Sequence, residues 1–244
     1  MASRAAFRRI GLLLPSSNTT QEPEFARILP PHVTLHLARL TLRRVEPDAT
    51  VRIVEEIEQE SRKLADADVD AIVLAATAPS SRFGIGYDRE LIARIAEASG
   101  KPATTAATAT MQALAELGVR RVALAAPWSD AVNAIAAAFM QASGCEVVAQ
   151  RALGLVDNLE IGLLDPQTAF DLGRQVDCPA AEAILLACGN WRTLEVVDAL
   201  EAATGKPVLT TNQVSLWAVL RLMGHAEPLA GWGRLLRDHL ALAD

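Results

Sequence analysis

The sequence lacks several features that would point to particular classes of protein. It has three cysteines, no run of basic residues and no apolar run approaching the roughly 20 residues that span a bilayer. The spacing of Cys145, Cys178 and Cys188 matches no zinc-ligand pattern, and an odd set of three cannot form a disulfide framework. The formal net charge is −6 and positive charge is scattered, which argues against a nucleic-acid partner. The first nine residues lack the apolar region of a secretory signal, so we expect a soluble, cytoplasmic protein.

Aromatic residues are also scarce, at 4% of the chain, whereas hydrophobic residues make up 51% and charged residues 21%. This is an ordinary globular balance with an aliphatic core, as expected for helices packed on parallel strands. A length of 244 residues suits one large domain or two lobes of roughly a hundred residues each.

The chain repeats itself at an offset of 112 residues. RRIGLLLPSSN at 8–18 aligns with RRVALAAPWSD at 120–130, and AIVLAAT from Ala71 aligns with AILLACG from Ala183. A third pair surrounds the GKP triplets that begin at Gly100 and Gly205, at an offset of 105. Three matches in the same order predict two equivalent lobes, 1–118 and 119–244, and the C-terminal segment is the part that could pack back on the first lobe.

Within each lobe, short apolar runs alternate with amphipathic stretches. The runs are typical of strands buried on both faces, and the stretch Val51–Ala65 has the periodicity of a helix. Further helices are expected at 88–98, 107–117, 130–143, 166–175, 194–204 and 215–223. The alternation predicts an α/β fold of two pseudo-symmetric, doubly wound lobes with parallel sheets and an active-site cleft between the lobes.

In parallel sheets, ligands bind beyond the carboxyl ends of the strands. Four loops meet that condition, at 15–18, 76–81, 127–130 and 188–190, and they are rich in hydroxyls, amides and small residues. Asn158, in a connecting segment, either belongs to a helix cap or reaches the mouth of the cleft. The residues predicted to contact the substrate are Pro15, Ser16, Asn18, Ala76, Thr77, Ala78, Trp128, Asn158, Gly189 and Asn190.

Cys188 is the candidate catalytic residue. Buried cysteines often only fill space, but Cys188 follows an apolar strand and precedes Gly189 and Asn190, whose N–H groups can face a ligand. A helix expected to begin near Thr193 would lower the pKa of the thiol. Its partner in the repeat is Ala76, which cannot transfer a proton, so we expect the chemistry to act from one side of the substrate.

Other polar features have competing interpretations. The cluster at 16–20 is equally consistent with helix capping and with a cradle for a carboxylate. Gly84-Ile85-Gly86 lacks the third glycine of a dinucleotide site and is interpreted as a turn, and the four histidines lie away from the four loops. We therefore expect neither a cofactor nor a metal.

The order and spacing of several segments resemble the aspartate/glutamate racemase superfamily, and within it the maleate isomerase and arylmalonate decarboxylase branch. The segments are IGLLLPSSNTT with Glu22, GIGYD at 84–88, DNLEIG at 157–162, LLACGN around Cys188 and the two GKP segments. For the isomerases, the resemblance implies two cysteines, one of which attacks maleate to give a succinylcysteine-like intermediate. Here one of these positions is Cys188 and the other is Ala76.

For the decarboxylases, the resemblance implies a single cysteine at position 188 with a small residue opposite. It also implies that Thr77 and the Gly189 backbone hold the carboxylate of an enediolate. The second hydroxyl of that family falls on Ala78 and its tyrosine on Trp128, so Ser80, Ser81 or Asn18 would have to supply the missing donor.

These observations predict a cofactor-independent enzyme that acts on a small dicarboxylate or related carbon acid through an enediolate-type intermediate, with Cys188 as acid or nucleophile. A malonate-type decarboxylase, that is a lyase, is the first interpretation. The alternatives are a maleate cis-trans isomerase and a non-catalytic protein that binds small carboxylates. A homo-oligomer is compatible with the sequence.

Overall fold

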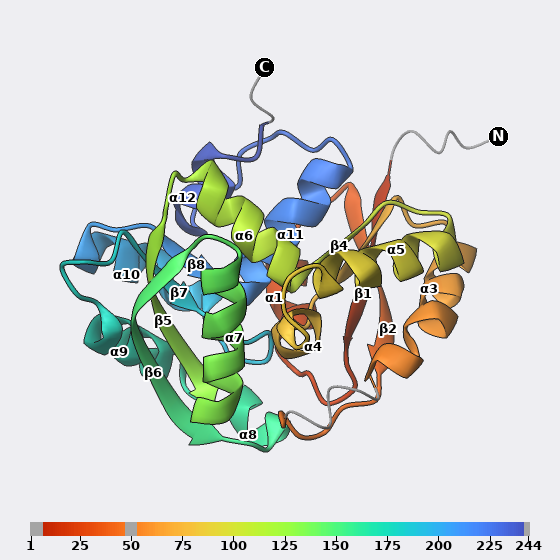
Figure 1. Cartoon of the computed structure of the whole chain (residues 1–244). Helices are drawn as coiled ribbons and strands as arrows, with labels where there is room; N and C mark the ends of the chain where they lie inside the picture. Colours follow the sequence, from red (N-terminus) through yellow and green to blue (C-terminus); the bar gives the residue numbers. More distant parts are fainter. Residues whose placement is uncertain (1–6, 47–52, 242–244) are drawn as a thin grey trace.

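Two parallel four-stranded sheets with the same strand order form the framework of the protein (Figure 1). The computed structural model describes residues 7–46 and 53–241. The first sheet has the order β2-β1-β3-β4, with β1 (Arg8–Pro15), β2 (Val33–Leu40), β3 (Ala71–Leu74) and β4 (Ala103–Thr105). The second has the order β6-β5-β7-β8, with β5 (Arg121–Trp128), β6 (Glu146–Leu155), β7 (Ala183–Leu186) and β8 (Val208–Thr210).

The register of the central strands repeats at the offset seen in the sequence. Ile10 of β1 lies opposite Ala71 of β3, and Val122 of β5 lies opposite Ala183 of β7. All strands in both sheets are parallel, and β3 and β7 are fully buried. The predicted α/β fold with two equivalent sheets is therefore confirmed.

Helices lie close to the predicted positions in most cases. The first half contains α1 (Gln21–Ile28), α3 (Ile57–Asp66), α4 (Thr77–Ser81), α5 (Tyr87–Ser99) and α6 (Ala106–Glu116). The second half contains α7 (Asp130–Ala142), α8 (Asn158–Gly162), α9 (Pro166–Val176), the 3₁₀ turn η2 (Leu194–Val196), α10 (Val197–Thr204), α11 (Thr211–Leu222) and α12 (Gly233–Asp238). The start of the predicted helix at Val51–Ala65 lies outside the described residues.

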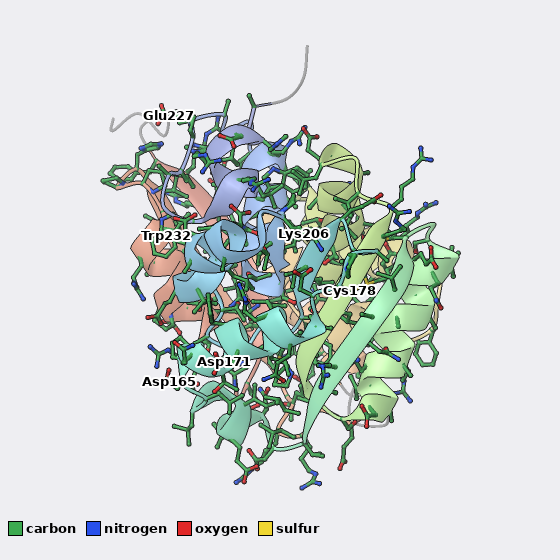
Figure 2. All side chains as sticks on the ribbon, turned by 90° about the vertical axis from the view of Figure 1, so that its left-hand side faces the viewer. Asp165, Asp171, Cys178, Lys206, Glu227 and Trp232 are labelled. Carbon is green, nitrogen blue, oxygen red and sulfur yellow. The ribbon has the colours of Figure 1, made fainter. Side chains whose placement is uncertain are left out.

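Four short helices, α1, α4, α8 and α12, were not predicted, because each is at most eight residues long and carries little periodic signal. Capping residues set several boundaries. Asp165 accepts the N–H of Gln167 at 2.8 Å where α9 begins (Figure 2). Thr210 accepts the N–H of Gln213 at 3.0 Å, so α11 begins at Thr211, four residues before the predicted start.

Helix α11 is the most buried of the described helices and lies in the centre of the molecule. Every residue from Thr211 to Leu220 is buried, as expected for a helix enclosed on all sides. It packs against α6, β3 and β4 of the first half and against β8 and α12 of the second. Its first turn therefore lies within reach of loops from both sheets.

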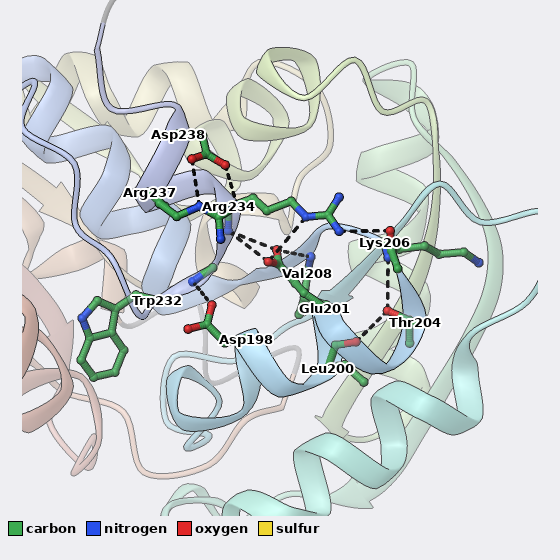
Figure 3. A network of polar contacts seen from close by, with 12 residues as sticks. Asp198, Leu200, Glu201, Thr204, Lys206, Val208, Trp232, Arg234, Arg237 and Asp238 are labelled. Atoms are coloured by element: carbon green, nitrogen blue, oxygen red, sulfur yellow. Dashed lines mark hydrogen bonds and ion pairs between the residues drawn. The ribbon is translucent and has the colours of Figure 1, made fainter.

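The C-terminal helix α12 packs on the second half of the chain (Figure 3). The carboxylate of Glu201 accepts the N–H groups of Val208 and Arg234, and Asp198 accepts the N–H of Gly233 at 2.8 Å. Because α11 contacts the first half, and His239 directly after α12 lies 3.4 Å from the carboxyl group of Glu116 in α6, a division of the chain into 1–118 and 119–244 remains a proposal. Within the described ranges, no helix has the length and apolarity that a membrane crossing requires.

Candidate active site

A cavity lies where the central strands β3 and β7 end. It has about 330 Å³ of space between atoms, including open solvent at its mouth. The residues that line it are Pro15, Asn18, Leu42, Val45, Ala75, Ala76, Thr77, Ala78, Pro79, Trp128, Asn158, Cys188, Gly189 and Asn190. All the predicted site residues except Ser16 are therefore brought together, and none of the lining side chains is charged. Sequence reasoning missed Leu42 and Val45, which follow an edge strand and carry no motif.

Cys188 lies in this cavity in an unusual backbone conformation. Its φ is +146°, a value that side chains with a Cβ rarely adopt and that stores about 1–3 kcal/mol of strain. Its N–H donates to Thr211 Oγ1 at 3.0 Å, and its sulfur is within reach of the N–H groups of Asn190 and Trp191. The residue is 4% exposed.

The direction in which the pKa of Cys188 shifts is opposite to our prediction. Burial raises the pKa of the Cys188 thiol to about 12, although the two nearby N–H groups act in the other direction. The expected helix near Thr193 is only the 3₁₀ turn η2, and α10 begins at Val197, so no helix N-terminus offsets the desolvation. The thiol is therefore protonated near neutral pH.

The facing loop of the first half has a different local structure. Ala76 is buried, and α4 begins immediately after it at Thr77. The Thr77 hydroxyl lies 2.9 Å from the hydroxyl of Thr211. Ser80 donates to the carbonyl of Ala76, directly before α4, at 2.8 Å, and Ser81 donates to the carbonyl of Thr77 at 3.0 Å; neither lines the cavity. They do not replace the missing donor.

Within the polar cluster at 16–20, the residues divide between the two interpretations that the sequence left open. Asn18 Oδ1 accepts the N–H groups of Thr20 and Gln21, both at 2.9 Å, and thereby caps the start of α1. Asn18 also lines the cavity. The Ser16 hydroxyl instead bonds the backbone of Leu42, donating to its carbonyl at 3.3 Å and accepting its N–H at 3.1 Å.

Two asparagines connect the loops of the two halves. Asn190 Oδ1 accepts the N–H of Thr19 at 2.7 Å, and its Nδ2 donates to the carbonyl of Asn158 at 2.5 Å. Asn158 Nδ2 donates in turn to Ser17 Oγ at 2.9 Å. Asp157, rather than Asn158, caps α8, by accepting the N–H groups of Leu159 and Glu160. The two amides therefore fix the mouth of the cavity.

Gly189 is required by close packing beside Cys188. A Cβ at this position would lie 2.5 Å from Gln21 Nε2 and 3.1 Å from the carbonyl oxygen of Ala75. No backbone acceptor for the Gly189 N–H occurs among the residues that the structure describes. Trp128, at the predicted tyrosine position, donates its Nε1–H to Asn133 Oδ1 at 3.2 Å. Gly189 therefore offers a donor to a ligand, whereas the Trp128 indole N–H is already engaged.

A buried carboxyl group behind the cavity was missed by sequence reasoning. Glu24 of α1 is 4% exposed, and its carboxylate accepts Asn212 Nδ2 at 2.5 Å and the N–H of Leu194 at 3.4 Å. Asn212 Nδ2 also donates to the carbonyl of Gly189 at 3.2 Å. Burial raises the pKa of Glu24 to about 7, and its hydrogen bonds offset only part of that shift. In the sequence, Glu24 is indistinguishable from an ordinary acidic residue in the first turn of a helix.

Comparison with known proteins gives relatives of two named activities. The family model described as arylmalonate decarboxylase matches residues 10–236. A maleate isomerase of Pseudomonas putida is 30% identical over 241 residues, covering 93% of this chain and 96% of that protein. An arylmalonate decarboxylase of Bordetella bronchiseptica is 30% identical over 238 residues, covering 96% of this chain and 99% of that protein.

The fold is shared with solved structures. A cysteine-to-serine variant of the Nocardia farcinica maleate cis-trans isomerase, with a covalently bound succinylcysteine intermediate, superposes with a TM-score of 0.90. The two are 27% identical, and the match covers 95% of this chain and 98% of that one.

Proposed function

The chain belongs to the arylmalonate decarboxylase family, a family of enzymes, and from that premise we propose that it decarboxylates a substituted malonate without a cofactor. The substrate binds in the cavity between β3 and β7. Cys188 protonates the carbanion that forms when carbon dioxide leaves. Maleate isomerisation is the alternative activity.

The observation that carries the proposal is the single protonated thiol in the cavity. Cys188 faces a loop whose equivalent position is Ala76, so only one face of a bound carbon acid meets a proton donor. Burial raises the pKa of Cys188 to about 12, which keeps the thiol neutral at pH 7. A neutral thiol suits delivery of a proton to a much more basic carbanion, whereas attack on a double bond needs the thiolate.

The donors near the thiol suit the carboxylate that remains on the substrate. The Thr77 hydroxyl and the Gly189 N–H lie in a cavity that no charged side chain lines. In such surroundings, aligned donors stabilise an enediolate more strongly than they would in water. Pro15, Leu42 and Val45 supply apolar surface, which disfavours the charge of the carboxylate that leaves.

The reaction is balanced with the residues present. The bond between the α-carbon and the departing carboxylate breaks, and its electron pair moves into the enediolate of the remaining carboxylate. The S–H of Cys188 then transfers its proton to the α-carbon from one face. A proton from the solvent then restores the S–H, so a malonate dianion and one proton give carbon dioxide and a monocarboxylate.

Maleate cis-trans isomerisation is kept as the second candidate because the Pseudomonas putida isomerase matches this chain at the same 30% identity as the decarboxylase. In that reaction Cys188 would add to the double bond, and rotation and elimination would follow. The protonated thiol and Ala76 both oppose this route.

The deciding experiment offers phenylmalonate, methylmalonate and maleate to the protein in D₂O and follows the products by NMR. We expect a malonate to release carbon dioxide and to give a monoacid with one deuterium on a single face of the α-carbon. Cys188→Ala should lower kcat by about 10²- to 10⁴-fold, the contribution of a positioned general acid. Cys178→Ala, which changes a half-buried thiol outside the cavity, should leave kcat unchanged.

Three outcomes contradict the proposal. Fumarate formed from maleate, with no release of carbon dioxide from the malonates, would favour the isomerase. Tight binding of dicarboxylates without turnover, unaffected by Cys188→Ala, would favour a binding protein. Turnover of a malonate that survives Cys188→Ala would remove the assigned acid.

A further inference from the structure

Thr211, the first residue of α11, joins the two loops that carry the proposed chemistry. Its Oγ1 accepts the N–H of Cys188 at 3.0 Å and lies 2.9 Å from Oγ1 of Thr77. Cys188 follows β7 of the second sheet, whereas Thr77 follows β3 of the first. One side chain therefore bridges the proposed proton donor and the proposed carboxylate donor.

The available hydrogen-bond partners indicate which of the two threonine hydroxyls is the donor in this bridge. Thr211 is 1% exposed, and Thr77 is the partner that the structure provides for its hydroxyl hydrogen. If Thr77 donated to Thr211, the hydrogen of Thr211 would be buried without an acceptor, at a cost of about 1–3 kcal/mol. If Thr211 donates to Thr77, its hydroxyl hydrogen has an acceptor, and its oxygen still accepts the N–H of Cys188. The hydrogen of Thr77, which lines the cavity, is then free for a ligand.

The same hydroxyl supports a strained part of the backbone. Cys188 has a φ of +146°, and its buried N–H has Thr211 Oγ1 as its acceptor. Without that acceptor, the native conformation of the loop would combine a strained backbone with an unsatisfied buried N–H group. The loop would therefore relax to another conformation. Relaxation would shift the thiol relative to the cavity.

Among the described residues of the first half, the position equivalent to Thr211 has no hydroxyl to form such a bridge. Strands β4 and β8 align at an offset of 105 residues, which pairs Thr105 with Thr210, and both of these cap the following helix. The next residue is Ala106 in the first half and Thr211 in the second. The hydroxyl is therefore present only on the side where the thiol is present.

We propose that Thr211 is a positioning residue, which holds the Cys188 peptide and orients the Thr77 hydroxyl toward the substrate carboxylate. The part of this inference that concerns the carboxylate rests on the proposed function. The part that concerns the Cys188 loop does not, and the two parts can be tested separately.

The kinetic test uses the malonate that gives turnover in the substrate panel. Thr77→Val should lower kcat by about 10²-fold, the typical effect of losing one donor to a developing oxyanion. Thr211→Val should lower kcat by about tenfold with a smaller change in KM, and Thr211→Ser should restore it. The double variant should lose less than the product of the two single losses, because part of the effect of Thr211 passes through Thr77.

Thr110→Val is the matched control for the loss of a buried threonine hydroxyl. Thr110 is 5% exposed, and its hydroxyl donates to the carbonyl of Ala106 at 2.8 Å within α6. It does not line the substrate cavity, but it lines a neighbouring pocket with Thr77 and Thr211, so it also controls for altered packing beside them. Its kcat should equal that of the wild-type protein. If Thr211→Val fails to fold, the comparison of Thr211→Ala with Thr211→Ser provides the same test.

A second test needs no substrate. Iodoacetamide labelling at pH 8.5, with mass spectrometry of each cysteine peptide, reports the accessibility of Cys188 relative to the half-buried Cys178. Cys188 should react more slowly than Cys178 in the wild-type protein. Thr211→Val should accelerate its labelling by about tenfold, because one hydrogen bond that holds the loop is lost. Thr110→Val should not.

Two results would overturn the inference. One is a Thr211→Val protein whose kcat and Cys188 labelling rate both stay within twofold of the Thr110→Val control. The other is a double variant in which the losses of Thr77→Val and Thr211→Val multiply. If the wild-type protein turns over no malonate, the proposed function fails, and the labelling rates still decide whether Thr211 holds the Cys188 loop.

Discussion

The two halves of the molecule contain sheets with the same strand order, but they differ in the loops that follow the central strands β3 and β7. After β3, the chain enters α4 directly at Thr77, and Ala76 is the last residue before the helix. After β7, no helix begins until η2 at Leu194, and Cys188 adopts a positive φ. One half therefore presents a hydroxyl at the start of a short helix, and the other presents a thiol on a loop with positive φ. A duplicated framework thus carries two different functions at equivalent positions.

The difference extends to residues behind the cavity. The buried Glu24 of α1 corresponds, at the offset of 112, to Ala136 of α7, which is buried and apolar. Thr211 corresponds to Ala106. In three pairs, at Ala76 and Cys188, Ala106 and Thr211, and Glu24 and Ala136, one member is alanine and the other is polar or ionisable. Thr211 bonds the Cys188 peptide directly, and Glu24 is linked to the carbonyl of Gly189 through Asn212, so both polar members connect to the Cys188 loop.

The strongest way to break this asymmetry is to place a second thiol opposite the first. Ala76→Cys should allow protonation and proton abstraction on both faces of the α-carbon. A chiral monoacid product should then lose its single configuration, and exchange of its α-proton should rise by about 10²-fold or more. Chiral chromatography and deuterium exchange followed by NMR measure the two effects.

Ala76→Ser is the control for that experiment, because it adds a side chain of similar size without an acidic thiol. It should retain the single configuration of the product. Racemisation by the serine variant would show that the effect does not require a second thiol, and none by the cysteine variant would show that position 76 does not face the α-carbon.

The site could be predicted from the sequence only where local patterns carried the information. The repeat paired Cys188 with Ala76, and the rule for the ends of parallel strands then selected most of the cavity lining. The burial of Glu24 and Thr211 could not be predicted, because it arises when α1 and α11 pack between elements from both halves. The pKa of Cys188 was predicted in the wrong direction, since it depended on a helix that is replaced by the short turn η2.

A smaller effect concerns the buried carboxyl group that only one half possesses. Burial raises the pKa of Glu24 to about 7 in the folded protein, from an ordinary value of 4.5 in the unfolded chain, so the folded state binds the proton more tightly. The resulting stability is fully present below pH 4.5, falls as the pH rises and is lost above pH 7. A rise in pKa from 4.5 to about 7 corresponds to ~3 kcal/mol.

Glu24→Gln should remove this dependence, because glutamine does not titrate. Urea unfolding at pH 4.5, 6 and 8 should show the free energy of unfolding of the variant rising relative to the wild-type protein across this range. The constant cost of altered hydrogen bonds to Asn212 and Leu194 cancels in that comparison of slopes. Parallel pH profiles for the two proteins would mean that Glu24 is not the titrating group.

The smallest expected effect compares the two GKP lysines, which occupy equivalent places. Lys101 Nζ donates to Asp68 at 2.9 Å, whereas Lys206 Nζ donates to Asp177 at 2.6 Å and also to the carbonyl of Cys178 at 2.6 Å (Figure 2). Asp68 is 43% exposed and Asp177 is 24% exposed, so water weakens the first ion pair more.

Lys101→Met should cost well under 1 kcal/mol and Lys206→Met about 1–2 kcal/mol, because only the second change also leaves a carbonyl without its donor. Urea unfolding of both variants at low and high salt separates these contributions, since salt should reduce the loss for Lys101→Met more than the loss for Lys206→Met. Equal losses in the two variants would mean that the additional bond to Cys178 contributes nothing, and that the two halves are alike in this element.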